Sequence, residues 1–408
     1  MNRIMLFNKK EDCCACGACL NICPKQAIRM ELDKYGFIYP VIDIAKCIGC
    51  GVCKKVCRYK KLKFDTLPLL VSVAQAERDV LKKSASGGVF ASIAQKVIVN
   101  GGKVYGVALK YENEKLVAKH IGIDTCDKLS ELQGSKYLQS NIGYVYSSIR
   151  SELNNNKIIL FSGTPCQVAG LRGFLGKKYE NLFCIDIICH GVSSNAFFQS
   201  YIECLEKKYN DKIIDFKFRD KSAGWGLMAN AYTANGKNIS IKSEDSSYYE
   251  FFLKSYTYRS NCYSCRYANG YRTGDITIGD YWGIWEEHPS LLSTNGGSIQ
   301  EKLGISCLLI NSEHGIALVN RYGNGVKQFM SEFSKVAKHN GQLNHPCKLD
   351  NKMRDKILTA YLNDGYDAVE RIFEHYTRLQ EFKRGVKRMV KGILPKMVLD
   401  TIRHTRKQ

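Results

Sequence analysis

The chain has 408 residues, of which 45% are hydrophobic and 24% are charged, a composition that excludes a fibrous or disordered class. This length exceeds a typical single hydrophobic core and predicts two or three domains. No stretch approaches the roughly 18 consecutive apolar residues of a membrane-spanning helix, and residues 1–10 lack the apolar run of a secretory signal. We therefore expect a cytoplasmic protein.

The formal net charge of +21 at pH 7 makes the chain strongly basic. A charge of this size favours acidic partners, such as a phosphate-bearing cofactor, an acidic protein or an anionic surface. Nucleic acid is not expected as a partner, because the sequence contains no zinc-finger or helix-turn-helix signature.

Cysteine is the most informative residue type. There are 18 cysteines, and nine of them lie between Cys13 and Cys57. Without an export signal, such a concentration indicates metal ligation or catalysis rather than disulfides. The segment holds two runs with the spacing C-x2-C-x2-C-x3-C of bacterial two-cluster ferredoxins, in which the last cysteine of each run ligates the other cluster. The predicted [4Fe–4S] ligand sets are Cys13, Cys16, Cys19 and Cys57, and Cys47, Cys50, Cys53 and Cys23.

The rest of residues 1–62 agrees with a small two-cluster domain. Residues 27–42 are expected to form a hairpin between the two cluster-binding turns. Cys14 is interpreted as non-ligating, and Arg58 stands where the ferredoxin pattern often has a proline. A pair of zinc sites is the alternative, although zinc usually takes two well-separated C-x2-C pairs.

Residues 68–345 are expected to form a larger α/β domain, and two of its segments suit an anionic ligand. Ser86, Gly87 and Gly88 precede apolar residues at helical spacing, which indicates a helix start. Free N–H groups at a helix start suit phosphate, although most such starts are ordinary caps. Lys136, in a glycine turn, offers a cation to an anion and would otherwise be a solvated surface lysine.

Two later strand–loop–helix units each carry one cysteine. A buried-type strand precedes Cys166 and another precedes Cys189, in the rhythm of a parallel α/β layer whose ligands gather at the strand carboxyl ends. Cys262 and Cys265 form a C-x2-C pair ahead of the alternating segment 275–283. These four cysteines make the ligands of a third metal site, but Cys166 could instead be a nucleophile, or all four could be inert small hydrophobic residues.

The C-terminal segment, residues 346–408, is expected to be helical and basic. From Arg378 onward, apolar residues recur at helical spacing among many Lys and Arg, and Pro395 ends the helix. Such a helix could lie on an anionic membrane surface or bind an acidic partner. The alternative is a terminal helix that packs on the domain with a solvated charged face.

Several separate motifs follow one another in a fixed order between Cys13 and about Asn311. They are Ser86-Gly87-Gly88, Gln133-Gly134-Ser135-Lys136-Tyr137, Gly163-Thr164-Pro165-Cys166-Gln167, Cys189-His190-Gly191, and Cys262-x2-Cys265 leading into Asp275-Ile276-Thr277-Ile278-Gly279-Asp280. In this order they resemble the coenzyme F420 hydrogenase/dehydrogenase beta-subunit family. The order of several motifs is much more specific than any one of them.

The resemblance implies a fold that is α/β (α+β overall). A small ferredoxin-like domain precedes a mixed α/β domain that binds FAD and a third [4Fe–4S] cluster, and a basic helical C-terminus follows. His190 could donate a proton to the substrate, or serve as a structural hydrogen-bonding residue. By this resemblance, the ligands of the third cluster are Cys166, Cys189, Cys262 and Cys265, and the residues that face FAD are Ser86, Gly87, Gly88, Lys136, Gly163 and Thr164.

The predicted function is that of an iron–sulfur flavoprotein oxidoreductase with a small-molecule substrate and a redox partner protein, either ferredoxin-like or a partner enzyme. Clusters carry single electrons, and a flavin converts these into two-electron steps. The segment Phe218-Arg219-Asp220-Lys221 is similar to bacterial proteins associated with surface-polysaccharide biosynthesis, so coenzyme F420 is not carried over as the substrate. The alternatives are a non-catalytic electron-transfer subunit and a cluster-based redox sensor.

Overall fold

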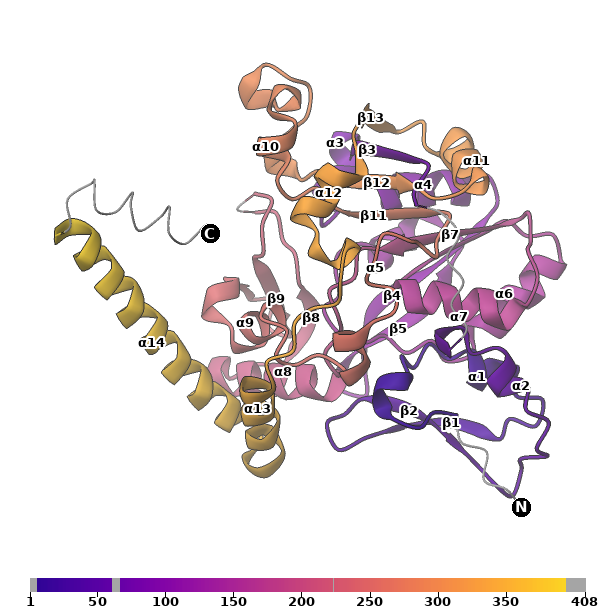
Figure 1. The fold of residues 1–408 in the computed structure, drawn as a ribbon, viewed down its shortest axis with the longest axis horizontal. Coiled ribbons are helices and arrows are strands. Elements are labelled where there is room, and N and C mark those ends of the chain that lie inside the picture. The colour runs from indigo at the N-terminus through magenta and orange to yellow at the C-terminus, as the bar shows by residue number, and fades with distance from the viewer. Residues whose placement is uncertain (1–5, 61–66, 223, 394–408) are drawn as a thin grey trace. The chain divides into compact units, whose positions relative to one another are not determined.

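The computed structural model describes residues 6–60, 67–222 and 224–393, with side chains up to residue 380 in the last segment. The chain divides into two compact units, Met1–Asn351 and Lys352–Gln408. The fold is mixed α/β, as the sequence predicts (Figure 1). Most of the connection expected between residues 62 and 68 lies outside the described residues.

The N-terminal cysteine-rich segment contains a two-stranded sheet and two short helices. The hairpin expected between the two cysteine runs is present as a pair of antiparallel strands. Each helix begins after a left-handed glycine, Gly17 with φ of 78° and Gly51 with φ of 72°, a conformation that costs glycine little. The elements are α1 (Ala18–Ile22), β1 (Ile28–Leu32), β2 (Ile38–Ile42) and α2 (Val52–Lys55).

An eight-stranded mixed sheet lies at the centre of the α/β region. From edge to edge its strands are β13 (Val326–Met330), β3 (Leu70–Ala76), β12 (Ser306–Ile310), β11 (Ile276–Asp280), β7 (Leu182–Ile187), β6 (Ile159–Gly163), β4 (Lys103–Glu112) and β5 (Lys115–Ile123). Strands β11, β7, β6 and β4 run parallel, and the other four pair antiparallel with their neighbours. The expected parallel layer therefore extends over four strands, whose carboxyl ends share one edge.

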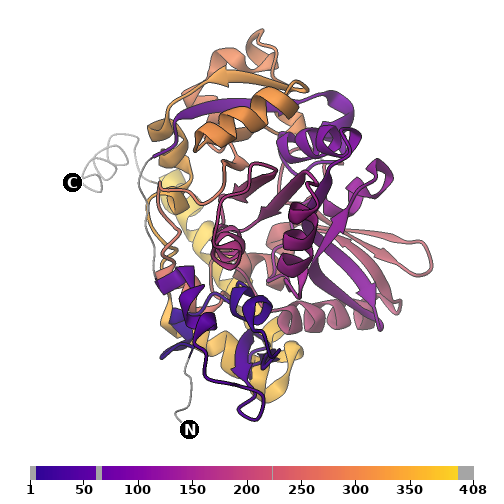
Figure 2. The same ribbon diagram turned by 90° about the vertical axis from the view of Figure 1, so that its right-hand side faces the viewer.

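Helices cover both faces of this sheet (Figure 2). The helices of the α/β region are α3 (Arg78–Lys82), α4 (Val89–Val99), α5 (Leu129–Leu132), α6 (Val145–Asn154), α7 (Pro165–Leu175), α8 (Asn195–Tyr209), α9 (Ser247–Leu253), α10 (Ile284–Glu287), α11 (Glu313–Tyr322) and α12 (Phe333–His339). Helices α4 and α11 pack on one face, and α6 and α7 pack on the other. Successive residues of β6 serve both cores, because Leu160 points to the first and Phe161 to the second.

A smaller antiparallel sheet, in the order β10-β9-β8, accompanies α8 and α9. Its strands β9 and β10 form the hairpin that the sequence predicts around Asn235 and Gly236, and Gly236 has φ of 79°. Buried aromatic rings fill the space between this sheet and α8, as in the edge-to-face contact of Phe198 with Phe216. The strands are β8 (Ile213–Lys217), β9 (Ala229–Thr233) and β10 (Asn238–Ile241).

Helix α7 brings the cysteine-rich segment close to the central sheet. A Cβ atom on Gly170 would lie 2.8 Å from the Cβ and 2.9 Å from the Sγ of Cys16. A Cβ atom on Gly173 would lie 2.5 Å from the carbonyl oxygen of Val56. Any larger residue at either glycine would overlap the cysteine-rich segment, so these two positions on α7 hold that segment at a fixed distance from the sheet.

The second unit contains α13 (Asn351–Asp364) and α14 (Tyr366–Ile393), which agrees with the expected helical C-terminal segment. Gly365, with φ of 72°, separates the two helices. The expected helix end at Pro395 lies outside the described residues, as do the side chains of most of the basic amphipathic pattern. Within the described chain, neither α14 nor any other helix combines the length and the apolar character needed to cross a membrane.

Candidate metal centres and cofactor cavity

Four cysteines from the two N-terminal runs lie together. Burial raises the pKa of the Cys13 thiol to about 11, with smaller contributions in the same direction from Cys16 and Cys57. The pKa of Cys19 is raised by burial first and then by Cys16, Cys13 and Cys57. Cys13, Cys16, Cys19 and Cys57, called here the first set, are therefore mutual neighbours. This is the grouping that the crossed ferredoxin spacing predicts.

The other four N-terminal cysteines line one small cavity. Cys23, Cys47, Cys50 and Cys53, called here the second set, surround it together with Ile28 and other apolar residues. Cys50 is exposed to solvent, whereas Cys53 is buried. Cys53 is also an electrostatic neighbour of Cys19, so the second set adjoins the first.

A much larger cavity, of about 480 Å³, opens at the carboxyl edge of the parallel strands. The ends of three of these strands and the residues that follow them line it: residues 162–167 at β6, residues 187–192 at β7, and residues 278–280 with Trp282 at β11. Because parallel strands end at the same edge, the topology collects these three loops around one space.

The third cysteine set lines this large cavity. It consists of Cys166 at the start of α7, Cys189 after β7, and the Cys262 and Cys265 pair. Burial raises the pKa of Cys265 to about 11, and the pKa of Cys189 is raised further by burial and then by Cys166 and Cys265. The pKa of Cys262 is raised by burial and by Cys189 and Cys265. The four thiols are thus neighbours, and their ligand role stays a prediction.

Cys14 lies between the first and third sets. Its thiol packs with Cys16 and Cys166, and its one S–H can donate to either sulfur, which raises the pKa of Cys14. The same S–H donation lowers the pKa of Cys16, and that of Cys166 to about 7. Cys14 is therefore the S–H donor, and one side chain contacts a sulfur of each set. The sequence contained no signal for this contact.

Most residues predicted to face a flavin line the large cavity. These are Ser86, Gly88, Lys136, Gly163 and Thr164. Gly87 is not among the lining residues in the described chain.

Gly87 instead packs between strands β3 and β12. Its amide donates to Ser306 Oγ at 2.9 Å, and a Cβ atom would lie 2.5 Å from the carbonyl oxygen of Ala74. The need for glycine at this position therefore comes from the neighbouring strands. Ser86 is held by Lys221, whose Nζ donates to the Ser86 carbonyl at 2.8 Å.

Two titratable side chains face the cavity from opposite loops. Lys136 is half-buried, its Nζ donates to the carbonyl of Gln133 at 2.6 Å, and burial lowers its pKa to about 7. His190 also lines the cavity, and burial lowers its pKa below the ordinary value. Among the described residues, no group is hydrogen-bonded to a ring nitrogen of His190. No contact there supports the alternative that His190 is a structural hydrogen-bonding residue.

Asp280 and Trp282 form a charged and aromatic wall of the cavity, a role that the sequence did not predict for them. Arg219 Nη1 donates to Asp280 Oδ2 at 2.9 Å and to the Tyr137 hydroxyl at 3.3 Å. Trp225 Nε1 donates to Asp280 Oδ1 at 2.9 Å, and its ring stacks on Trp282 with centroids 5.0 Å apart. Arg219, Tyr137 and Asp280 each belong to a segment noted in the sequence, but their contacts with one another could not be read from it, because these segments are distant along the chain.

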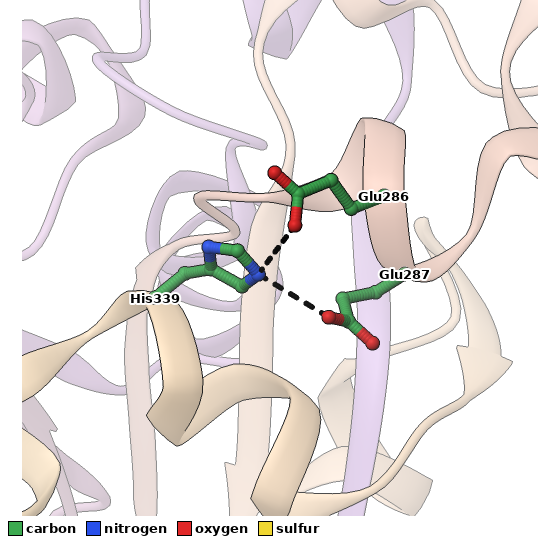
Figure 3. Close-up of side chains that lie close together, drawn as sticks. All are labelled: Glu286, Glu287 and His339. Atoms are coloured by element: carbon green, nitrogen blue, oxygen red, sulfur yellow. Dashed lines mark hydrogen bonds and ion pairs between the residues drawn. The ribbon is translucent and has the colours of Figure 1, made fainter. Parts of the chain in front are cut away.

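Glu286, Glu287 and His339 form a separate group whose ligand atoms lie within 4.8 Å of one another (Figure 3). Lys338 bridges the two carboxylates and offsets one of their two negative charges, with Nζ 2.7 Å from Glu287 Oε1 and 3.6 Å from Glu286 Oε2. The His339 ring also packs over Gly283, where a Cβ atom would lie 2.2 Å from it. We interpret this group as an ion-pair contact between α10 and α12.

Comparison with known proteins identifies two segments of the chain. Residues 156–331 match the C-terminal part of the family described as "Coenzyme F420 hydrogenase/dehydrogenase, beta subunit", and residues 12–61 match "4Fe-4S dicluster domain". No curated protein matches the chain. Among solved structures, it is similar to a chain of the F420-reducing [NiFe] hydrogenase complex from Methanosarcina barkeri. That match has 14% identity and a TM-score of 0.45, and it covers 69% of this chain and 92% of the other.

The two family matches account for the cysteine sets in different ways. The 4Fe-4S dicluster match spans all eight cysteines of the first and second sets, and so assigns iron–sulfur clusters to the N-terminal segment. The second match spans the third set and the greater part of the large cavity's lining. The chain therefore joins a segment that matches a 4Fe-4S dicluster domain to a segment that matches the C-terminal part of the coenzyme F420 hydrogenase/dehydrogenase beta-subunit family, and the two matches together support an iron–sulfur protein that transfers electrons.

Proposed function

We propose that this chain is an iron–sulfur flavoprotein oxidoreductase that passes electrons between [4Fe–4S] clusters and FAD, and so reduces or oxidises a small substrate or deazaflavin-type coenzyme. One observation carries the proposal: a single cavity of about 480 Å³ is lined by the third cysteine set, Lys136 and His190. Cys14 also lines this cavity and packs with Cys16 of the first set, so the dicluster segment adjoins the cavity.

The donor chemistry of each cysteine set fits a cubane cluster. Each set offers four thiols, which is the number that a [4Fe–4S] cluster takes. The second set lines a cavity of its own, and the third set lines the large one. Burial alone makes thiolates costly, but a bound metal reverses this cost because a coordinating thiol is deprotonated. We therefore propose three clusters, with Cys166, Cys189, Cys262 and Cys265 holding the third.

The large cavity fits an anionic, partly aromatic cofactor. Its volume lies within the range of about 300–1,000 Å³ that small-molecule and cofactor sites span. Thr164 caps the first turn of α7, whose free N–H groups favour an anion, and Lys136 and Ser86 add a cation and a hydroxyl. When bound, FAD would supply the conversion between one-electron and two-electron transfer. We propose that Ser86, Gly88, Lys136, Gly163 and Thr164 hold it.

The chain's own groups in the cavity would manage protons and water. Lys136 has a pKa of about 7, so it can hold or release a proton near neutral pH. His190 is neutral at that pH because its pKa is lowered, and we propose that its ring exchanges a proton with the substrate. Apolar lining residues, including Leu138 and Ile188, exclude water from the reacting centre.

We propose that an acidic redox protein binds at the second set. Cys50 is exposed there, and Ile48 next to it is 60% exposed. Lys54 and Lys55, in the last turn of α2, are exposed as well. A basic rim around a short apolar contact favours an acidic partner and accelerates its binding.

Other parts of the proposal rest on the sequence. We also propose a cytoplasmic location and a role in surface-polysaccharide biosynthesis. We propose three segments, at residues 1–62, 68–345 and 346–408, and peripheral membrane association through residues 378–408. All 18 cysteines are free thiols, and a reducing cytoplasm would keep them available as ligands.

Flavin retention tests the proposed cavity function. After anaerobic reconstitution with FAD and desalting, the wild-type protein should keep about one FAD per chain, reducible by dithionite. Lys136→Met should lose at least nine-tenths of it, and the matched control Lys177→Met, at an exposed lysine after α7, should keep it. Flavin-free wild-type protein would contradict the proposal. Retained FAD without turnover of any diffusible acceptor would favour a non-catalytic electron-transfer subunit.

A further inference from the structure

Arg259 is a buried cation at the junction of the cysteine sets. It is 1% exposed and directly precedes the short helical turn that contains Cys262. Its backbone carbonyl accepts a hydrogen bond from the Cys262 amide at 2.9 Å. One residue is thus built into the loop of the third set, and its guanidinium extends away from that loop.

The guanidinium is hydrogen-bonded to neutral groups of the N-terminal segment. Nε and Nη2 donate to the carbonyl of Cys13 at 3.1 and 3.0 Å. Nη1 donates to the carbonyl of Ile38 at 2.9 Å and to Gln139 Oε1 at 3.1 Å. The charge lies 3.8 Å from the ring centroid of Tyr39. These contacts engage four of the five N–H donors, and none of the acceptors carries a negative charge.

Two other arginines with buried side chains are each paired with a carboxylate. Arg272 lies 3.0 Å from Asp186, and Arg219 lies 2.9 Å from Asp280. No carboxylate among the described residues lies within 4.0 Å of Arg259. An isolated buried charge is strongly unfavourable, so a counter-charge is expected close to it.

The groups that can supply this counter-charge are the cysteine sets on either side. The guanidinium of Arg259 donates to the carbonyl of Cys13 in the first set, and the residue lines the same cavity as Cys166 of the third set, so its charge adjoins both sets. A [4Fe–4S]2+ cluster with four thiolates carries about −2, and one-electron reduction makes it more negative.

We propose that Arg259 is the shared counter-cation of the clusters held by the first and third cysteine sets, and that it raises the reduction potentials of both. For the third set, this inference rests on the proposed function. For the first set, it needs only the dicluster domain. Arg259 lines the large cavity, but the role proposed for it is that of a positioning residue that acts through the clusters, and its guanidinium stays charged at every working pH.

The test is an EPR-monitored redox titration of anaerobic, cluster-loaded, full-length protein. Arg259→Met should lower the midpoint potentials of both clusters by at least 59 mV, a tenfold change in the one-electron reduction constant. Arg259→Lys keeps the charge and should change that constant less than threefold. Lys327→Met, which removes an exposed cation on β13, is the control and should also change it less than threefold.

Gln139→Glu provides an independent variant in case Arg259→Met does not hold its clusters. It places a carboxylate where Gln139 Oε1 now accepts from Arg259 at 3.1 Å, so it neutralises the same charge in place. It should lower both potentials as Arg259→Met does. Unchanged midpoint potentials in Arg259→Met would overturn the proposal. If Arg259→Met does not hold its clusters, unchanged potentials in Gln139→Glu would overturn it instead. An equal fall in Arg259→Lys would also overturn it, because hydrogen bonding rather than charge would then be responsible.

Iron content separates this inference from the proposed function. A wild-type protein with about eight irons would refute the third cluster, and the potential of the first set would still decide the role of Arg259. A protein with about twelve irons and unshifted potentials would refute the role of Arg259 alone.

Discussion

Replacing Asp186 by asparagine should loosen the loop that leads from the third cysteine set into β11. Asp186 is fully buried in β7, and its Oδ2 accepts from the amides of Thr273 and Gly274 at 2.9 Å each. Its Oδ1 accepts from Thr277 Oγ1 at 2.6 Å and from Arg272 Nη2 at 3.0 Å. Asparagine keeps the shape of the side chain but removes its charge. It also replaces one carboxylate oxygen, which accepts hydrogen bonds, by an NH2 group that would face other hydrogen-bond donors.

The size of the effect follows from the burial of both partners. The side chains of Arg272 and Asp186 are 1% and 0% exposed, and breaking such a buried pair from one side costs about 3–5 kcal/mol. This is a large part of the roughly 5–15 kcal/mol that stabilises a domain. A loss of about 3 kcal/mol corresponds to more than a hundredfold increase in local opening.

Hydrogen–deuterium exchange is the suitable assay, because unfolding of a chain with several domains and bound metals is not two-state. In Asp186→Asn, the amides of Thr273 and Gly274 should exchange at least a hundredfold faster than in the wild type. The control Asp79→Asn changes an exposed carboxylate on α3 and should leave them unchanged. Asp186→Asn with Arg272→Met removes both charges and should recover part of the protection. Unchanged exchange in the single variant, or no recovery in the double variant, would refute the reasoning.

Three further predictions concern the cavity, α7 and the surface near the second set. The pKa of Lys136 is about 7, so its cation is lost as the pH rises through 7. Binding of an anionic flavin should therefore weaken above that pH. In a fluorescence titration between pH 6 and 9, Lys136→Met should abolish this pH dependence. Gly170→Ala should lower the iron content by about four atoms per chain, because the added Cβ would lie 2.9 Å from a first-set sulfur. The double variant Lys54→Glu with Lys55→Glu should slow the reduction of this protein by an acidic plant-type ferredoxin at least tenfold at low ionic strength, as measured by stopped-flow absorbance. Its reduction by dithionite should be unchanged.

Each of these predictions has a matched control. A flavin affinity that is flat across pH 7 in the wild type would rule out the role of Lys136. Gly226→Ala adds a methyl group where nothing lies within 4 Å, and equal iron loss there would show that the Gly170 effect is nonspecific. Lys207→Glu with Lys208→Glu makes the same charge change at the exposed end of α8. An equal slowing in that variant would refute a docking site near the second set.

The groupings of the N-terminal cysteines could be predicted because the spacing of ligands along the chain is local. Each triplet must curl around one centre, and the structure gathers Cys13, Cys16 and Cys19 with Cys57 as that spacing requires. The approach of Cys166 to Cys189 followed from topology, since both come after parallel strands whose carboxyl ends share an edge. The Cys262 and Cys265 pair had no such argument, and resemblance alone placed it near them.

The contacts that join distant elements could not be predicted. Arg259 donates to Cys13, which is more than 200 residues away, and nothing in the residues around either position indicates this. Gly87 shows a second limit of sequence-based prediction. A glycine beside a helix start has the same sequence pattern whether a ligand or a neighbouring strand excludes a side chain there. The antiparallel strands β3, β12 and β13 at one side of the sheet likewise depend on pairing across the fold.

Quantitation of iron, sulfide and flavin in anaerobically prepared full-length protein, combined with low-temperature EPR, tests the central claim most directly. The account predicts about twelve irons, about twelve sulfides and about one FAD per chain, with EPR signals of three reducible cubanes. About eight irons would contradict a third cluster at Cys166, Cys189, Cys262 and Cys265. A colourless protein that holds zinc or no metal would contradict the account as a whole.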